Sequence, residues 1–522
     1  MALAATQTTF SNGLARAGDE VTFASHIAAI IYENCAGCHR SGQPGPFALL
    51  SFDDVRRHSQ TIVEVTQARY MPPWKPVDAG IAFANHRGLL ATEVDTIANW
   101  VAAGCPEGER TSAPPAPEFE NEWSLGQPDL VLKMDRPFRV PADGPDLYRS
   151  FALPAQLPED RWVKAIELRP QARGVVHHAL FFVDDGGALR SQRENDGQPG
   201  VRGMKFVSGS GASFLQRGPA GLAGGLGGYV PGAMPNRLPG GLARRLPADS
   251  DIVMQTHFHP TGKEETEQAE LGLYFAEKAP EHLLVPIQLP PLFGIGAGID
   301  IPAGQQDYAI RQSYTLPIDV MAIETSGHAH YLCRTMRLTA DLPSGKQLVL
   351  LQIDDWDLDW QDQYQFAEPI DLPRGTTLTA RITYDNSADN PENPFSPPRR
   401  IQWGRESTDE MGSITLQVIA KAESQRTVLE GEMRDRARES IRDRITTKSG
   451  PLAGLARGRL GSGGLLRALD HNRDGKLSEN EIPQQFRDRI LEAFDSNGDR
   501  DLDTNELEIA RESMRDLLRE SK

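Results

Sequence analysis

The chain has 522 residues and a formal net charge of −17, and its composition, 39% apolar and 24% charged, is that of a globular protein. This length predicts about three or four domains with cores large enough to fold without a disulfide framework, and the chain has only 4 cysteines. The negative charge argues against nucleic acid as a partner, and no apolar stretch approaches the roughly 18 residues that a membrane-spanning helix needs.

Residues 21–110 are predicted to form a small helical domain that carries haem. Its decisive motif is Cys35-Ala-Gly-Cys38-His39, because two thiols at this spacing can each bond a haem vinyl group while the adjacent histidine binds the iron. Half of a zinc site is the alternative, but the chain has no second CxxC to complete a tetrahedron. The segment is therefore predicted to be a c-type cytochrome domain, and a Pro-rich linker follows it over 111–127.

The second axial ligand of the iron should be a thioether or another imidazole. Met71, in the segment ARYMPPW, resembles the Met-Pro loop of small c-type cytochromes and is the preferred candidate, with His58 and His86 as alternatives. A methionine that only fills a gap in the core is the competing interpretation of Met71.

Residues 128–420 are predicted to form two antiparallel β-sandwiches, over 128–285 and 286–420. Short apolar or alternating runs recur here, separated by Pro, Gly and Asp turns, which is the pattern of sandwich strands. A Gly-rich stretch over 208–228 is expected to be a surface excursion. The fold class is accordingly a multidomain, mostly β chain with α-helical domains at both ends.

The 12 histidines of the chain are unevenly distributed, because six of them form three close pairs: His177-His178, His257-Phe258-His259 and His328-Ala329-His330. A strand directs residues i and i+2 to one face, so a His-x-His pair can bind one ion, whereas His177 and His178 can do so only if the strand twists or bulges there. A single pair is commonly structural, but three pairs in a β region predict metal ligands. The absence of an HExxH helix disfavours a zinc hydrolase, and imidazoles with a soft thioether, for which Met411 is a candidate, favour copper.

Four segments, in this order, carry a resemblance to a known family: VVHHALFF, IVMQTHFHP, GHAHYLCRTMRL and TDEMGSITL. Over residues 128–420 the chain resembles the copper type II ascorbate-dependent monooxygenases, which include peptidylglycine α-hydroxylating monooxygenase and dopamine β-monooxygenase. The resemblance implies two jelly-roll-like β-sandwiches that each carry one copper ion and face each other across a water-filled cleft. It assigns His177, His178 and His257 to an electron-transfer copper, and His328, His330 and Met411 to an oxygen-activating copper. His259 has no ligand role in that pattern.

The reaction implied by the resemblance is hydroxylation of an aliphatic C–H bond in a small molecule with O2, with electrons from an external reductant such as ascorbate or a cytochrome. The peptide-processing members bind a substrate carboxylate with an Arg, an Asn and a Tyr, where this chain has Ser326, Ser413 and Thr415. A peptide C-terminus is therefore not the expected substrate. Cys333 is expected to be a buried small side chain rather than the disulfide partner of Cys105.

Residues 421–464 are predicted to be a charged helix and a Gly-rich linker, and 465–522 an EF-hand pair. Two calcium loops have side-chain or carbonyl ligands at positions 1, 3, 5, 7, 9 and 12: Asp470, Asn472, Asp474, Lys476, Ser478 and Glu481, then Asp495, Asn497, Asp499, Asp501, Asp503 and Glu506. Position 6 is Gly475 in the first loop but Arg500 in the second, which must adopt the conformation that glycine usually supplies. An acidic tail is the alternative interpretation, and the sequence leaves open whether calcium regulates or stabilises.

The leading hypothesis is a periplasmic or secreted copper-dependent monooxygenase that receives electrons through its fused haem. Covalent haem attachment is normally completed outside the cytoplasm, so we expect a leader peptide that is absent from the numbered chain. The alternative is a non-catalytic haem and copper protein for electron transfer or copper binding. A zinc hydrolase ranks last, because no general-base carboxylate accompanies the histidines in the sequence.

Overall fold

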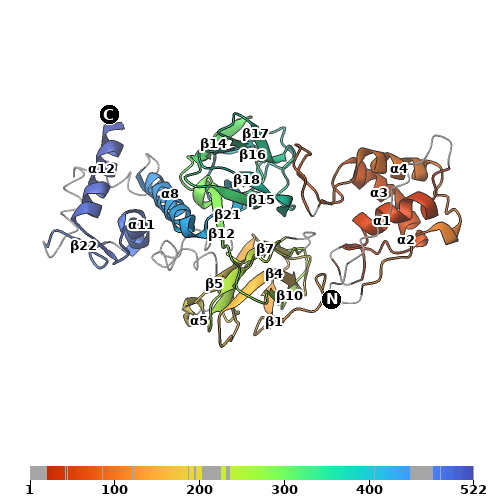
Figure 1. The fold of residues 1–522 in the computed structure, drawn as a ribbon, viewed down its shortest axis with the longest axis horizontal. Coiled ribbons are helices and arrows are strands. Elements are labelled where there is room, and N and C mark those ends of the chain that lie inside the picture. Colours follow the sequence, from red (N-terminus) through yellow and green to blue (C-terminus); the bar gives the residue numbers. More distant parts are fainter. Residues whose placement is uncertain are drawn as a thin grey trace. The chain divides into compact units, whose positions relative to one another are not determined.

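The computed structural model describes residues 20–520 except 42, 44, 85, 120–122, 186, 193–195, 203–224, 231–234, 405, 447–473 and 483. The chain divides into two compact units, which are residues Met1–Trp74 with Arg87–Glu122, and residues Lys75–His86 with Trp123–Lys522. In the described ranges, no helix combines the length and the apolar character that crossing a bilayer requires. The elements are labelled in Figure 1.

The first unit is built from short helices around a small apolar core. They are η1 (Phe23–Ile27), α1 (Ala28–Asn34), α2 (Phe52–Arg57), α3 (Ser59–Gln67), α4 (Ala91–Ala102) and η2 (Arg110–Ser112). Ile27, Ile31, Ile97 and Trp100 are at most 1% exposed and pack together from three of these helices. Ser51 begins α2, because its hydroxyl accepts a hydrogen bond from the Asp54 N–H and so satisfies a backbone donor of the first turn.

The second unit begins its β region with a sandwich of a five-stranded and a four-stranded sheet, in the orders β6-β3-β9-β5-β7 and β1-β11-β4-β8. Its elements are β1 (Leu130–Lys133), β2 (Phe138–Val140), β3 (Leu147–Pro154), β4 (Arg161–Arg169), β5 (Val176–Asp184), α5 (Ala188–Ser191), β6 (Val201–Arg202), β7 (Gly227–Tyr229), β8 (Arg244–Leu246), β9 (Asp251–Phe258), β10 (Glu265–Glu267) and β11 (Glu270–Phe275). Side chains from both sheets, such as Met254 and Leu271, share one core.

A second sandwich follows, with two four-stranded sheets in the orders β12-β21-β15-β18 and β14-β19-β16-β17. Its elements are β12 (Leu284–Leu289), η4 (Pro291–Gly294), β13 (Asp300–Ile301), β14 (Tyr308–Thr315), β15 (Val320–Ala329), β16 (Cys333–Asp341), β17 (Gln347–Ile353), β18 (Gln363–Leu372), β19 (Thr377–Tyr384), β20 (Ile401–Gln402) and β21 (Gly412–Ala420). All sixteen strand pairings recorded for the described strands are antiparallel, which confirms the predicted β-rich, antiparallel character.

The segment Lys75–His86 lies along the edge of this second sandwich. Backbone hydrogen bonds join Val77 N–H to the Gln352 carbonyl at 2.9 Å and Ala84 N–H to the Gln365 carbonyl at 2.8 Å. The Lys75 ammonium, which is only 8% exposed, lies 3.3 Å from Asp355 and 3.4 Å from Asp357. The segment therefore covers the open edges of β17 and β18 and is anchored to the loop between them.

The chain ends in helices that pack against the second sandwich. The elements are η5 (Glu423–Gln425), α8 (Arg426–Thr446), β22 (Leu477–Ser478), α11 (Gln484–Phe494), β23 (Asp501–Leu502) and α12 (Thr504–Glu520). One apolar cluster joins Ala437 of α8 and Leu292 of η4 to Leu477, Phe494 and Leu502. The long helix is thus fixed between the sandwich and the C-terminal elements.

The two sandwiches share one buried ion pair, between Arg244 of β8 and Glu324 of β15. The Arg244 guanidinium lies 2.8 Å from the Glu324 carboxylate, and the two side chains are 15% and 8% exposed. Removal of one partner leaves the other charge buried without compensation, which typically costs about 3–5 kcal/mol.

We therefore expect Arg244→Met to lower the free energy of unfolding of the β region by about 3 kcal/mol, measured by urea denaturation. Lys421→Met is the matched control, because Lys421 pairs with Asp371 on the surface and its loss should cost less than about 1 kcal/mol. Equal losses in the two variants would show that the Arg244–Glu324 pair does not hold the sandwiches together.

Candidate metal centres

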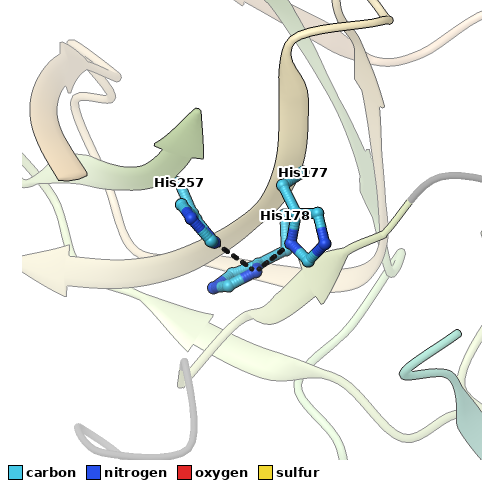
Figure 2. Close-up of side chains that lie close together, drawn as sticks. All are labelled: His177, His178 and His257. Carbon is cyan, nitrogen blue, oxygen red and sulfur yellow. Dashed lines mark hydrogen bonds between the residues drawn. The ribbon is translucent and has the colours of Figure 1, made fainter. Parts of the chain in front are cut away.

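A β-bulge brings His177, His178 and His257 together on the first sandwich. The ladder between β5 and β9 pairs Val176 with Phe258 and then His178 with His257, so that His177 is an extra residue. Of the twist or bulge that the adjacent histidines require, the bulge is therefore present. Figure 2 shows the three rings directed toward one another, two of them from β5 and one from β9.

The Nδ1 atoms of this three-histidine group converge. Nδ1 of His178 lies 3.2 Å from Nδ1 of His177 and 3.3 Å from Nδ1 of His257 (Figure 2), and one nitrogen of each ring falls within 4.8 Å of the other two. Metal–imidazole bonds of about 2 Å place ligand nitrogens about 3.3 Å apart in a tetrahedral site. The spacing therefore fits one metal ion bound by three Nδ1 atoms.

Carboxylates hold the opposite nitrogens of two of these rings. Nε2 of His257 lies 2.8 Å from Oδ2 of Asp146, and Nε2 of His177 lies 2.8 Å from Oδ1 of Asp359, which belongs to the second sandwich. A ring that donates Nε2–H to a carboxylate keeps its Nδ1 lone pair available, and this arrangement orients histidines in metal sites. The structure thus selects Nδ1 as the ligand atom.

Burial favours the neutral form of two imidazoles of this group, those of His178 and His257. Desolvation and the neighbouring His257 and His177 rings lower the pKa of His178 well below its usual value. Desolvation also lowers the pKa of His257, against the opposing effect of Asp146. Neutral imidazoles bind metal without first losing a proton, so the group is prepared for an ion at neutral pH.

Asp146 joins both sandwiches at this group. Its carboxylate accepts a hydrogen bond from the Ser407 hydroxyl of the second sandwich at 2.6 Å and lies 2.8 Å from Nδ1 of His259. Burial alone would raise the pKa of Asp146, but the hydrogen bonds from His257 and Ser407 lower it far below its usual value. His259 and His257 therefore share the carboxylate of Asp146.

The second candidate centre is built by β15 and β21. Their ladder pairs His328 with Ser413 and Ala329 with Gly412, so that His330 directly follows β15 and Met411 directly precedes β21. Because residues two apart share a face, His328, His330 and Met411 are all on the same face of the sheet. Met411 is 4% exposed, which places its thioether in the interior.

In the second centre, the Nδ1 atoms of the two histidines have hydrogen-bond partners, whereas in the first centre Nδ1 is the converging atom. Nδ1 of His328 lies 2.7 Å from the Gln361 side-chain oxygen, and Nδ1 of His330 lies 3.3 Å from the Asp409 carbonyl. These contacts leave Nε2 as the ligand atom of both rings. Burial lowers the pKa of His328 to about 4 and, with the neighbouring His328, lowers that of His330 to about 3, so both are neutral at pH 7.

A buried carboxylate fixes the backbone on both sides of this centre. Glu410, 0% exposed, accepts N–H hydrogen bonds from His330 at 2.6 Å, Met411 at 2.8 Å and Leu332 at 3.0 Å. Burial nonetheless raises the pKa of Glu410 to about 8. The next residue must be glycine, because a Cβ on Gly412 would lie 1.9 Å from the Tyr384 hydroxyl, which itself donates to the Met411 carbonyl.

One loop serves both centres. Asp359 and Gln361, two positions apart between β17 and β18, contact His177 of one centre and His328 of the other. No spacing in the sequence pointed to Asp146, Asp359, Gln361 or Glu410, since their partners lie 111, 182, 33 and 80 positions away. The sequence reasoning therefore missed all the residues that orient the proposed ligands.

The haem motif lies in the turn after α1. The His39 N–H donates to the Cys35 carbonyl at 2.9 Å, and Nδ1 of His39 lies 3.1 Å from the Phe47 carbonyl, which leaves Nε2 for iron. The Phe47 ring stacks on His58 with centroids 3.8 Å apart. Of the three candidates for the second axial ligand, Met71 and His58 belong to the first unit, with the haem motif, and His86 belongs to the second unit. The identity of this ligand stays a prediction. The four cysteines form no disulfide bond with one another, and Cys333 is buried.

The second calcium loop lies within the described residues, whereas Asp470 and Asn472 of the first lie outside them. Arg500 has φ +67°, the left-handed conformation that its position requires. Glu506, 2% exposed, accepts N–H hydrogen bonds from Ser496 and Asp503 at 2.5 and 2.9 Å. Asp495 is also buried, and its carboxylate accepts from the Gly498 and Arg500 N–H groups. Buried acidic oxygens around this turn form a donor set that suits calcium.

No family model and no curated protein matches the chain. The solved structures that are similar include a peptide-N(4)-(N-acetyl-β-D-glucosaminyl)asparagine amidase, with 10% identity, 56% of this chain and 97% of that chain covered, and a TM-score of 0.25. A structure of PNGF-II is 11% identical, with 58% of this chain and 65% of that chain covered and a TM-score of 0.20. The major capsid protein P2 from bacteriophage PM2 is 8% identical, with 56% of this chain and 97% of that chain covered and a TM-score of 0.21. TM-scores this low carry no argument about fold or function.

Asp146 offers a direct test of the three-histidine centre. We expect Asp146→Asn to weaken Cu(II) binding there by about 10- to 100-fold, because the His257 ring loses the carboxylate that orients it. Competition titration against a chelator measures the affinity. Asp160→Asn is the matched control, since Asp160 pairs with Arg245 on the surface of the same sandwich. Unchanged affinity in Asp146→Asn would exclude His257 as a ligand.

Proposed function

We propose that this chain is a copper-dependent monooxygenase that hydroxylates an aliphatic C–H bond of a small molecule with O2. The observation that supports the proposal most is the donor arrangement: three histidines that present Nδ1 on one sandwich, and two that present Nε2 beside a buried methionine on the next. Imidazoles with one soft sulfur suit copper that alternates between two oxidation states, and disfavour the hard, oxygen-rich sites of magnesium or calcium.

When bound, copper at the methionine centre would supply O2 activation, and copper at the three-histidine centre would supply an electron. The chain's own part is to hold neutral imidazoles in place before the metal arrives. Asp146 and Asp359 direct two Nδ1 lone pairs to one point, and Gln361 turns Nε2 of His328 toward the other. Glu410 fixes the backbone of His330 and Met411, so neither ligand has to be ordered on binding.

The polar residues beside the methionine centre bear on the substrate. Ser326 and Thr415 are opposite each other in the ladder, and His328 is opposite Ser413, so all four are on one face. Arg244 of the first sandwich, which reaches the same strand, is already paired with Glu324. These neutral hydroxyl groups support a small substrate without a carboxylate, rather than a peptide C-terminus.

The other modules fit the same proposal. Cys35, Cys38 and His39 would hold haem c, which supplies one-electron transfer from an external reductant, ascorbate-like or another cytochrome. The two C-terminal loops would hold calcium. A covalently bound haem supports a periplasmic or secreted location.

Metal content tests the proposal as a whole. We expect about two copper ions and one iron per chain after reconstitution with copper and desalting, measured by mass spectrometry on haem-loaded protein. Iron with one copper or none would contradict the monooxygenase proposal. It would favour a non-catalytic haem and copper protein that transfers electrons or binds copper.

Met411 tests the role of the second centre. Met411→Leu keeps the size of the side chain but removes the sulfur, so we expect it to abolish the Cu(I)–sulfur contribution to X-ray absorption and to lower hydroxylation by roughly 100-fold or more. Met254→Leu is the control, because Met254 is buried in the core of the first sandwich away from the six ligands. A retained sulfur contribution in Met411→Leu would show that another residue is the ligand.

A further inference from the structure

A short strained segment connects the C-terminal elements to the methionine centre. Leu292 and Phe293 of η4 both have positive φ, +55° and +56°, which residues with a Cβ adopt at a free-energy cost. Such a conformation persists only where surrounding contacts fix it. The contacts of these two adjacent residues lie on different sides of the segment.

On one side the segment touches the second candidate centre. The Phe293 ring lies edge-on to the His328 ring, with centroids 4.9 Å apart and planes at 71°. The Phe293 carbonyl accepts from the Trp403 indole at 3.0 Å, and its N–H donates to the Gln288 side chain at 3.3 Å. A Cβ on Gly294 would lie 2.9 Å from the carbonyl of Gly412, the residue that follows Met411.

On the other side the segment belongs to the core of the C-terminal elements. Leu292, 7% exposed, packs in one cluster with Leu477 and Leu502, which are both 0% exposed. These two leucines are paired in the β22–β23 ribbon that joins the two predicted calcium loops. The α8 backbone is equally close, since a Cβ on Gly296 would lie 2.7 Å from the Ser440 carbonyl.

We propose that Phe293 is a positioning residue for His328 and that calcium binding by the second C-terminal loop, from Asp495 to Glu506, is transmitted through Leu292 and strengthens copper binding at the methionine centre. The inference rests on the proposed function, because it assumes copper at that centre. Leu502 lies inside that loop and is paired with Leu477, so calcium bound there would stabilise the cluster that holds Leu292. A fixed Leu292 keeps Phe293 in its left-handed conformation against the His328 ring. By linkage, copper must strengthen calcium binding by the same factor.

The test measures Cu(I) affinity by chelator competition on the full haem-loaded chain, with calcium and with EGTA. His178→Ala isolates the methionine centre, and Met411→Leu isolates the three-histidine centre. We expect calcium to strengthen Cu(I) binding at the methionine centre by at least about fivefold and to leave the three-histidine centre unchanged. Calcium affinity, measured by calorimetry with and without Cu(I), should change by the same factor.

Two variants locate the coupling. Phe293→Leu should remove the response to calcium while the chain still binds calcium, and Glu506→Gln should remove the response by weakening calcium binding itself. Phe395→Leu is the matched control, because Phe395 packs on Arg399 of the same sandwich rather than on His328, and it should keep the full response. Melting temperature with and without calcium separates coupling from general stabilisation.

Equal Cu(I) affinity with calcium and with EGTA, or a full response in Phe293→Leu, would overturn the inference and leave the proposed function intact. A rise in melting temperature without a change in Cu(I) affinity would also overturn it. Absence of copper at the methionine centre in both conditions would overturn the inference together with the proposed function.

Discussion

The pairing of β21 with β15 is the constraint on which the candidate chemistry depends. That ladder places His328 and His330 of one strand beside Met411, which directly precedes the other, and all three share a face because side chains alternate along a strand. Glu410 then links the segments that carry His330 and Met411, because its carboxyl group accepts hydrogen bonds from three backbone N–H groups. A shift of one residue in this register would turn the histidines into the sandwich core and separate them from the methionine.

Contacts between the two sandwiches orient one of the proposed ligands and join the loops beside both centres. Asp359 of the second sandwich holds His177 of the first, and Asp146 of the first accepts from Ser407, four residues before Met411. Arg244 and Glu324 join the same two sandwiches by a buried ion pair. The three-histidine centre is therefore oriented by carboxylates of both sandwiches, although its proposed ligands come from the first alone. Such support holds the rings in order before any metal binds.

The buried electrostatics follow one pattern. Desolvation favours the neutral forms of four histidines, His178, His257, His328 and His330, whereas Asp146 stays ionised because it receives hydrogen bonds from His257 and Ser407. A site of neutral donors with negative charge one residue further out can accept a cation without ejecting protons. Glu410 differs, because burial raises its pKa to about 8 although its carboxyl group accepts hydrogen bonds from three backbone N–H groups.

The sequence by itself determined the antiparallel β-rich character of the chain and singled out the histidine pairs. Both are local properties, since strand alternation and the His-x-His spacing are read within about ten residues. It also required a twist or bulge at His177-His178 and a left-handed Arg500, and the structure has the bulge and the left-handed residue. Tertiary structure alone decided which nitrogen of His177, His257 and His328 is left for the proposed metal, because Asp359, Asp146 and Gln361 reach these rings across up to 182 positions of the chain. The contact of Phe293 with His328 was also decided by tertiary structure alone. The local sequence of neither segment indicates which distant residue will pack against it.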